Sequence, residues 1–211
     1  MMNSRVKRSL LGSLCVLLVI LVMGLMIWPR TPVNLGDPAQ MSASGLYLHW
    51  QAGDVIALVR HAERCDRSDH PCLGPADGIT LVGQATSTEV GRAYRSLGMS
   101  NVEVLSSPLT RTLQTSQYMF GKPARPQPWL SSCGPTLKND VLAHKQARHN
   151  LVLVTHSGCI SDLETQLGYE HALASEYTCS LFLVVEPGGE LKVLGIMNSE
   201  NWPPLLNKVQ Q

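Results

Sequence analysis

The chain has 211 residues and a formal net charge of +1 at pH 7. Its Gly, Pro, apolar and charged contents are those of an ordinary globular protein, which excludes wholesale disorder. The charge is unevenly placed: the first 28 residues contain three cations and no acid, and the remainder has 14 basic and 16 acidic residues. A folded part without a basic excess lacks the electrostatic footprint of a nucleic-acid-binding protein, so we expect no nucleic-acid partner.

The N-terminal part contains an uncharged apolar run, Leu10–Trp28, of 19 residues. As a helix it would be about 28 Å long, close to the roughly 30 Å of a bilayer core. The cations precede this run and only Arg30 follows it closely, so the positive-inside rule leaves the N-terminus in the cytoplasm and exports the rest. A cleaved signal is the alternative, but the run exceeds the 7–15 apolar residues typical of a signal. We therefore expect an N-terminal transmembrane helix that anchors the protein to a membrane.

The organisation predicted from these patterns has four parts. Residues 1–28 are a cytoplasmic stub and membrane anchor (or signal), and residues 29–43, rich in Pro, Gly, Ser and Asn, are a linker. Residues 44–202 are one domain, and residues 203–211 are a tail.

Strand and helix patterns alternate along the domain. Short β-branched apolar runs predict buried strands, and a Thr cap or a terminal Gly marks helix ends. In chain order the predicted elements are a strand over 55–59, a helix from Thr80 to Gly98, a strand over 102–105, a helix over 109–120, a helix over 137–148, a strand over 151–155, a helical stretch ending near Gly168, and a hairpin over 181–196. This alternation predicts a three-layer α/β/α sandwich with a mostly parallel sheet.

The cysteines agree with an exported domain. Five of the six lie outside the apolar run, so at most two disulfides can form with one thiol left over. We expect at least one disulfide, involving Cys65 or Cys72, and an unpaired, buried Cys179 at the start of an apolar run. No spacing of Cys and His typical of a zinc site occurs.

Reactive side chains follow three of the predicted strands. Arg60 and His61 end the first strand, Arg111 follows the second at the start of a helix, and His156 follows the third. Ligand sites of open α/β sheets lie beyond the carboxyl ends of the strands, so these side chains should meet. Arginine binds two phosphate oxygens with one planar fork, and a histidine fixed by a second hydrogen bond can attack phosphorus as a neutral imidazole.

The segments V-R-H-A-E, S-S-P-L-T-R-T-L-Q-T and V-T-H-S-G resemble the three signatures of the histidine phosphatase superfamily, in its phosphoglycerate mutase-like branch. Each motif is weak alone, but the three occur in order at strand ends across roughly residues 50–200. The stretch R-H-A-E-R-C-D-R-S, with the Cys-Leu and Gly-Ile-Thr that follow it, is also similar to the lipopolysaccharide core heptose(II)-phosphate phosphatases, which are periplasmic proteins of Gram-negative bacteria.

The resemblance implies a histidine acid-type phosphatase, a phosphomonoesterase that works through a phosphohistidine intermediate. Its substrate would be a phosphorylated envelope sugar or glycolipid such as lipopolysaccharide core heptose phosphate. The domain would be periplasmic, anchored to the inner membrane or secreted into the periplasm. No metal or cofactor is implied. The residues to which the resemblance assigns roles are His61 (nucleophile), His156 (catalytic), and Arg60, Arg111 and Arg67 (substrate binding), and we add Glu63 as a candidate catalytic residue.

One departure from the family pattern concerns the general acid. Many relatives supply a glutamate between the second arginine and the second histidine, where this chain has only Asp140. Glu63 or Asp66, near the nucleophile, are the substitutes, or there is none. Two other functions stay open: a non-catalytic phosphate-binding or sensing domain, and a metal-dependent hydrolase that uses His61 and His156 as ligands. The second leaves the two arginines unexplained, because cations repel a metal ion.

Overall fold

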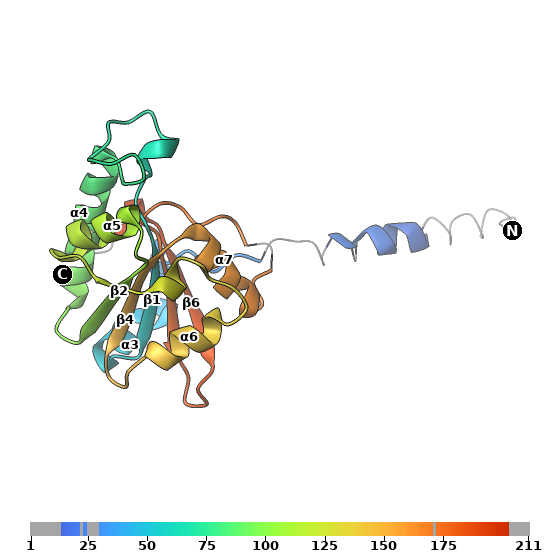
Figure 1. Cartoon of the computed structure of the whole chain (residues 1–211). Coiled ribbons are helices and arrows are strands. Elements are labelled where there is room, and N and C mark those ends of the chain that lie inside the picture. The colour runs from blue at the N-terminus through green and yellow to red at the C-terminus, as the bar shows by residue number, and fades with distance from the viewer. Residues whose placement is uncertain (1–13, 22, 25–29, 171, 203–211) are drawn as a thin grey trace, which may run out of the picture.

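The computed structural model describes residues 14–21, 23–24, 30–170 and 172–202 (Figure 1). Much of the predicted span Leu10–Trp28, and the tail 203–211, lie outside the described residues. Among the helices of the described ranges, none is long and apolar enough to cross a membrane. The named elements are α2 (Pro38–Ser44), α3 (Leu46–Ala52), β1 (Val55–Arg60), η1 (Cys65–Arg67), α4 (Leu81–Leu97), β2 (Val102–Ser106), α5 (Thr110–Phe120), β3 (Arg125–Pro126), η2 (Pro128–Leu130), α6 (Leu137–His144), β4 (Asn150–Thr155), α7 (Ser157–Gln166), β5 (Ser180–Val185), β6 (Leu191–Met197) and η3 (Ser199–Asn201).

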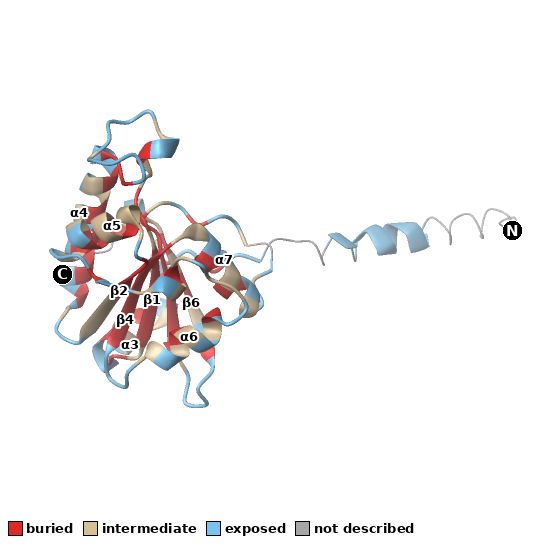
Figure 2. Ribbon diagram, viewed as in Figure 1, coloured by how far each residue is buried: buried red, intermediate tan, exposed pale blue. Residues whose placement is uncertain are grey.

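The strands form one sheet in the order β3-β2-β4-β1-β5-β6. The pairs β3–β2, β2–β4 and β4–β1 are parallel, whereas β1–β5 and β5–β6 are antiparallel. Strands β1 and β4 are central and almost fully buried, as their continuous apolar sequences predict (Figure 2). The mostly parallel sheet and its terminal hairpin are therefore confirmed.

Helices cover both faces of the sheet. On one face, side chains of α3, α4 and α5 such as Trp50, Tyr94 and Met119 pack on the alternate strand residues Val55, Ala57 and Val59. On the other face, side chains of α6 and α7 pack on the intervening strand residues. Successive side chains of a strand point to opposite faces, so a strand buried on both faces has to be apolar throughout. This arrangement is the predicted three-layer sandwich (Figure 1).

The longest described helix of the domain, α4, begins and ends where its sequence predicts. The Thr80 side chain accepts a hydrogen bond from the backbone N–H of Gly83 at 2.9 Å, which satisfies one of the free donors of the first turn. Gly98, with φ of 101°, ends the helix. The helix predicted over 137–148 is shorter than expected and ends at His144, because the next residue, Lys145, has an extended backbone with φ of −79° and ψ of 110°.

The predicted linker needs correction from Val33 onward. The Leu35 N–H donates to the Ile196 carbonyl at 2.8 Å, so this segment pairs with the edge strand β6, and the Leu35 side chain is fully buried. Two short helices, α2 and α3, follow and bury Met41, Leu46 and Trp50. Pro38 is consistent with a linker, but proline is also favoured in the first turn of a helix, where Pro38 lies in α2.

The chain between β1 and α4 projects beyond the body of the domain as a long loop, drawn in teal (Figure 1). A disulfide between Cys65 and Cys72, with a Cα–Cα distance of 5.2 Å, closes this loop on itself. A second disulfide joins Cys133 to Cys159 in α7, and Cys179 is a buried free thiol. These pairings agree with the disulfide and the unpaired cysteine predicted from the sequence.

Candidate active site

The predicted site residues come together at one edge of the sheet. Arg60 is the last residue of β1, and the His61 N–H donates to the Thr155 carbonyl of β4 at 2.9 Å. His156 directly follows β4 and precedes α7. Because β1 and β4 run parallel with Arg60 opposite Thr155, the two histidines end side by side, with ring centroids 5.2 Å apart.

His61 is held in one tautomer. Its Nδ1 lies 2.7 Å from the Ala62 carbonyl oxygen, which can only accept, so Nδ1 carries the hydrogen. The neutral ring therefore has its lone pair on Nε2. The ring is 3% exposed, and burial, together with the nearby His156, Arg111 and Arg60, lowers its pKa to about 3. At neutral pH His61 is an uncharged imidazole, the form in which a histidine acts as a nucleophile.

His156 is held in the other tautomer, with its hydrogen on Nε2. A guanidinium group only donates, so the Arg111 Nη2, at 3.5 Å, makes His156 Nδ1 the acceptor. Its Nε2 then carries the hydrogen and donates to Ser107 Oγ at 2.9 Å. Burial and the neighbouring Arg111, Arg64 and Arg60 lower the pKa of His156 to about 4. This ring too is neutral at pH 7, in a site whose cations disfavour further positive charge.

Arg60 is clamped by the segment before β5. Its Nη1 donates to the Ser175 carbonyl, and its Cζ lies 3.9 Å from the centroid of the Tyr177 ring, a cation–π contact. Its buried Nε–H has no acceptor within the described chain, and the same holds for Arg111 Nε. Buried donors are normally paired, so two unpaired arginine donors beside His61 and His156 indicate a site built for an anion.

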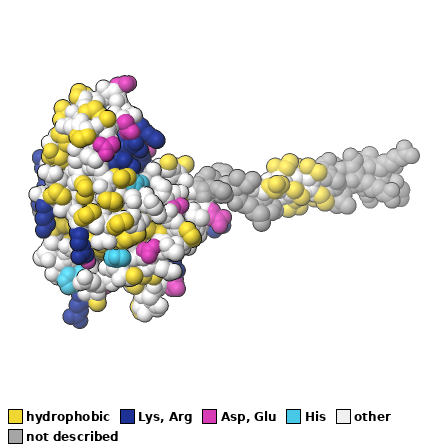
Figure 3. All heavy atoms as spheres, in the orientation of Figure 1, with side chains coloured by type: hydrophobic (Ala, Val, Ile, Leu, Met, Phe, Trp, Pro, Cys, Tyr) yellow, Lys and Arg dark blue, Asp and Glu magenta, His cyan; other side chains and the backbone are white. Residues whose placement is uncertain are grey.

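Further cations surround this centre. Arg64 is held by Asp66 through a hydrogen bond of 2.7 Å from Nε, and Arg67 is exposed on η1, where its side chain has no hydrogen-bond partner among the described residues. Burial, then the positive charges of Arg64 and Arg67, lower the pKa of Arg111. Figure 3 shows basic side chains beside acidic ones below the projecting loop. Arg67 is thus close enough to Arg111 to lower its pKa, but its side chain makes no hydrogen bond with His61 or His156.

Glu63 lies near the histidines in sequence but its carboxylate is engaged elsewhere. It accepts hydrogen bonds from Thr80 Oγ1 at 2.7 Å and His70 Nδ1 at 2.9 Å. Burial raises the pKa of Glu63, but these hydrogen bonds outweigh it and leave the pKa lowered. Asp66 likewise has a lowered pKa because of its hydrogen bond with Arg64. Both groups are carboxylates at neutral pH, which is the wrong form for a proton donor.

Sequence reasoning missed three residues that shape the site. Tyr177 contacts Arg60 and lies 5.7 Å from the His61 ring by centroids, and Ser107 accepts from His156. Thr115 Oγ1 accepts from the Ala62 N–H at 2.9 Å and so fixes the chain after His61. Ser107 and Thr115 stand within the second motif, but nothing in the sequence marks Tyr177, which reaches the site only through the β1–β5 pairing.

The donors around the two histidines do not suit a metal ion. Within the described ranges, no three His, Cys, Asp or Glu side chains are grouped to bind one. The groups that approach His61 and His156 are guanidinium groups, which repel cations and attract a phosphate.

Solved structures of phosphatases and mutases share this fold. The protein histidine phosphatase SixA complexed with tungstate is 16% identical, covers 70% of this chain and 98% of its own, and gives a TM-score of 0.57. Phosphoglycerate mutase from Bacillus anthracis is also 16% identical, covers 76% and 99%, and gives 0.52. Phosphoserine phosphatase from Entamoeba histolytica, in complex with 3-phosphoglyceric acid, is 15% identical, covers 70% and 98%, and gives 0.54. At such identities the likeness establishes the fold.

Sequence comparison leads to a narrower group. The chain is 34% identical over 110 residues to the lipopolysaccharide core heptose(II)-phosphate phosphatase of Salmonella typhimurium, which is 51% of this chain and 54% of that protein. The protein of the same name from Salmonella enteritidis PT4 gives the same values. The chain therefore matches about half the length of these curated relatives. No family model matches it.

Proposed function

We propose that the protein is a phosphomonoesterase of the histidine phosphatase type that acts through a phosphohistidine at His61. The observation that carries this proposal is the fixed, neutral His61 ring. Its Nδ1 donates to the Ala62 carbonyl, and its Nε2 carries the lone pair beside Arg60, Arg111 and His156. Few other chemistries need an uncharged histidine surrounded by cations that bind phosphate.

In the first step of the proposed reaction, the phosphate lies against the guanidinium groups of Arg60 and Arg111, whose buried Nε–H donors lack other acceptors. His61 Nε2 forms a bond to phosphorus while the bond from phosphorus to the ester oxygen breaks, and the released alkoxide takes a proton from water. The imidazole becomes cationic as it is phosphorylated, and its Nδ1–H bond to the Ala62 carbonyl stabilises that charge. Water then hydrolyses the phosphohistidine to inorganic phosphate.

The proposed role of the arginines is to stabilise charge on the transferring phosphoryl group, and that of His156 is to hold Arg111 in place. Arg111 is held against His156 and Arg60 against Tyr177, so both guanidinium groups are positioned before substrate arrives. Preorganised donors in a shielded site stabilise the developing charge without reorganisation. Arg67, which is exposed on the disulfide-closed loop, would add a contact to the phosphate from the solvent side.

The proposed substrate is a phosphorylated sugar of the cell envelope, such as lipopolysaccharide core heptose phosphate. The 34% identity to proteins named for that activity supports it, over the half of their length that the chain matches. The proposed location is the periplasm, with the domain anchored to the inner membrane through Leu10–Trp28 or released if that segment is cleaved. The uncharged run and the two disulfides support an exported domain.

Trapping of the intermediate tests this function. Rapid quench with a ³²P-labelled aryl phosphate should give a phosphoprotein that is labile to acid and stable to alkali, and His61→Ala should give none. His149→Ala, an exposed histidine outside the site, is the matched control. Label on a serine, or near-native turnover by His61→Ala, would refute the mechanism. Phosphate binding without any turnover would favour the alternative, a phosphate-binding or sensing domain.

A further inference from the structure

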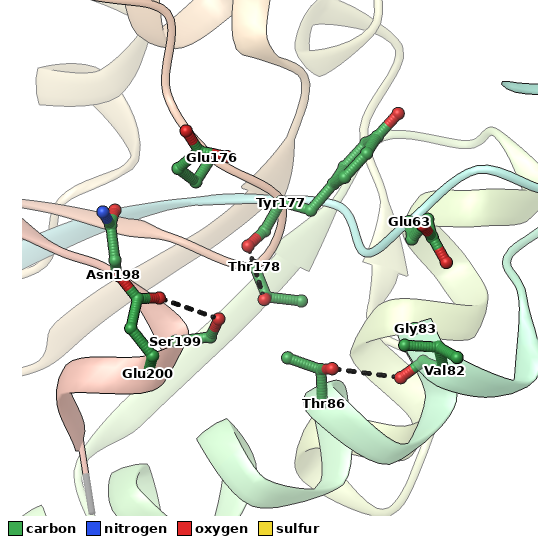
Figure 4. Close-up of a pocket in the computed structure, with 10 residues that line it drawn as sticks. All are labelled: Glu63, Val82, Gly83, Thr86, Glu176, Tyr177, Thr178, Asn198, Ser199 and Glu200. Carbon is green, nitrogen blue, oxygen red and sulfur yellow. Dashed lines mark hydrogen bonds between the residues drawn. The ribbon is translucent and has the colours of Figure 1, made fainter. Parts of the chain in front are cut away.

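A pocket of about 360 Å³ adjoins the candidate active site. It is formed by the chain after β1, the first turns of α4, the loop before β5 and the chain after β6 (Figure 4). Its size is at the small end of ligand pockets, which suits one sugar ring better than an oligosaccharide. Its lining is polar and rich in hydrogen-bond acceptors: Glu63, Thr86, Glu176, Tyr177, Thr178, Asn198, Ser199 and Glu200, with Val82 and Gly83.

Tyr177 belongs both to this pocket and to the phosphate-binding centre. Its ring covers the guanidinium of Arg60 at 3.9 Å and lies 5.7 Å from the ring of His61, while the residue also lines the pocket. Glu63, two residues after His61, lines it as well. Tyr177 and Glu63 thus connect the pocket to the phosphate-binding centre.

The backbone beside Tyr177 is strained. Thr178 is buried and β-branched, yet its φ is 58°, in the region that favours glycine. Its N–H donates to the His61 carbonyl at 3.4 Å and its Oγ1 to the Tyr177 carbonyl at 2.6 Å. These contacts tie the segment to the chain of the nucleophile. Strained backbone persists only where the surrounding structure holds it, and here it lies next to Tyr177, which belongs to both the pocket and the phosphate-binding centre.

The two compartments differ in charge. The cations Arg60, Arg64 and Arg111 lie near His61 and His156, whereas the pocket is lined by three glutamates and by no Lys or Arg. The carboxylates and the Asn198 amide oxygen accept hydrogen bonds from hydroxyl groups and repel a second phosphate. Tyr177 offers an aromatic surface to an apolar face of a sugar ring.

We propose that this pocket is the subsite for the hydroxyl-bearing sugar part of the substrate, and that Asn198 and Glu200 determine specificity for it. The inference rests on the proposed phosphatase function and adds the place and chemistry of sugar recognition. Asn198 and Glu200 follow β6 and contact none of the phosphate-binding residues through a hydrogen bond in the described chain. Their loss should therefore affect the sugar and spare the phosphoryl transfer.

The experiment compares a methyl heptoside monophosphate with 4-nitrophenyl phosphate, using the full chain. Asn198→Ala and Glu200→Ala should each lower kcat/KM for the heptoside phosphate about tenfold, mainly through KM, because hydrogen bonds to a sugar hydroxyl are lost. The same variants should hydrolyse 4-nitrophenyl phosphate within about twofold of the parent, since that substrate has no hydroxyl to recognise. Glu89→Ala, an exposed glutamate on α4, is the control and should change neither value.

Equal losses on both substrates, or no loss on the heptoside phosphate, would overturn the subsite. If the parent hydrolyses neither compound, the proposed function fails, and binding then tests the subsite separately. In that case calorimetric titration of the methyl heptoside phosphate into His61→Ala should give an affinity about tenfold higher than for His61→Ala combined with Asn198→Ala. Equal affinities would refute the sugar subsite whatever the activity.

Discussion

His61 and His156 meet edge to face, with ring centroids 5.2 Å apart and an interplanar angle of 62°. Each ring is fixed by its own partner: His61 Nδ1 donates to the Ala62 carbonyl, and His156 Nε2 donates to Ser107. Each ring therefore has one unprotonated nitrogen, Nε2 on His61 and Nδ1 on His156. Both rings lie near arginine side chains. This relationship leads to predictions on activity and on pH dependence.

Substitutions at the site should follow an order of severity. His61→Ala should abolish turnover, because it removes the atom that forms the covalent intermediate. Arg60→Ala and Arg111→Ala should each lower kcat about 10²–10³-fold, the scale of losing one donor to a developing charge. His156→Ala should be no more severe than Arg111→Ala, since His156 acts by holding Arg111. Steady-state kinetics with 4-nitrophenyl phosphate gives the order; an Arg111→Ala variant as active as the parent would contradict it.

Stability should fall in acid because of the buried histidines. In the unfolded chain a histidine binds its proton near pH 6.5, but in the folded protein burial lowers the pKa of His61 to about 3 and that of His156 to about 4. Below about pH 6.5 the unfolded state thus binds more protons than the folded state. The contribution of these histidines to the free energy of unfolding is therefore greatest above about pH 6.5 and decreases below it. Each histidine contributes up to about 1.4 kcal/mol per pH unit.

Urea unfolding of the parent and of His61→Gln at several values between pH 4.5 and 7 measures this effect. The variant should lose less stability in acid than the parent does. His149→Gln, which changes an exposed residue, should keep the parental dependence. An identical pH dependence for His61→Gln and the parent would show that His61 is not buried in its neutral form.

The two disulfides should have different roles. By loop-closure entropy, removal of Cys65–Cys72 should cost about 2.5 kcal/mol and removal of Cys133–Cys159 about 3.5 kcal/mol, because the second closes a longer loop. The first, however, holds the loop that carries Arg64 and Arg67. The variant with both of these cysteines changed to Ser should lose at least about tenfold in kcat/KM, because the cations are misplaced. The variant that lacks Cys133–Cys159 should retain more activity.

Peptide mapping should find both disulfides and a free Cys179. Five free thiols in exported protein would refute the pairing.

Glu63 should act by holding the loop rather than as the general acid. Its carboxylate accepts from Thr80 and His70, and its pKa is lowered. Glu63→Gln should therefore lower the rates for glycerol 1-phosphate and 4-nitrophenyl phosphate by the same factor, below about tenfold. A general acid matters most for a poor leaving group, so a selective loss on glycerol 1-phosphate of 10²-fold or more would identify Glu63 as that acid. Asp66→Asn serves as the parallel variant.

Activity should survive chelation. The proposed phosphate ligands are guanidinium and imidazole groups, which need no bridging cation to bind an anion. Dialysis against EDTA should leave kcat with 4-nitrophenyl phosphate unchanged, and added zinc or magnesium should not increase it. Loss of activity in EDTA, with recovery on adding a metal, would support the metal-dependent hydrolase instead.

The sequence alone determined the sheet, most helices and the four residues Arg60, His61, Arg111 and His156 at its edge. The reason is local: continuous β-branched runs specify buried strands, and in parallel strands the residues after each carboxyl end share an edge. Cysteine number and position likewise predicted a disulfide near His61 and the unpaired Cys179.

Only the tertiary structure determines the features that depend on contacts between segments distant in the chain. Tyr177 reaches Arg60 because β5 pairs antiparallel with β1, and no local pattern encodes that pairing. Residues 33–44 contain proline and glycine signals that suit a linker, but contact with β6 and burial of Leu35 make them part of the domain. The protonation states of His61 and Glu63 were also beyond the sequence, because burial and hydrogen-bond partners set a pKa.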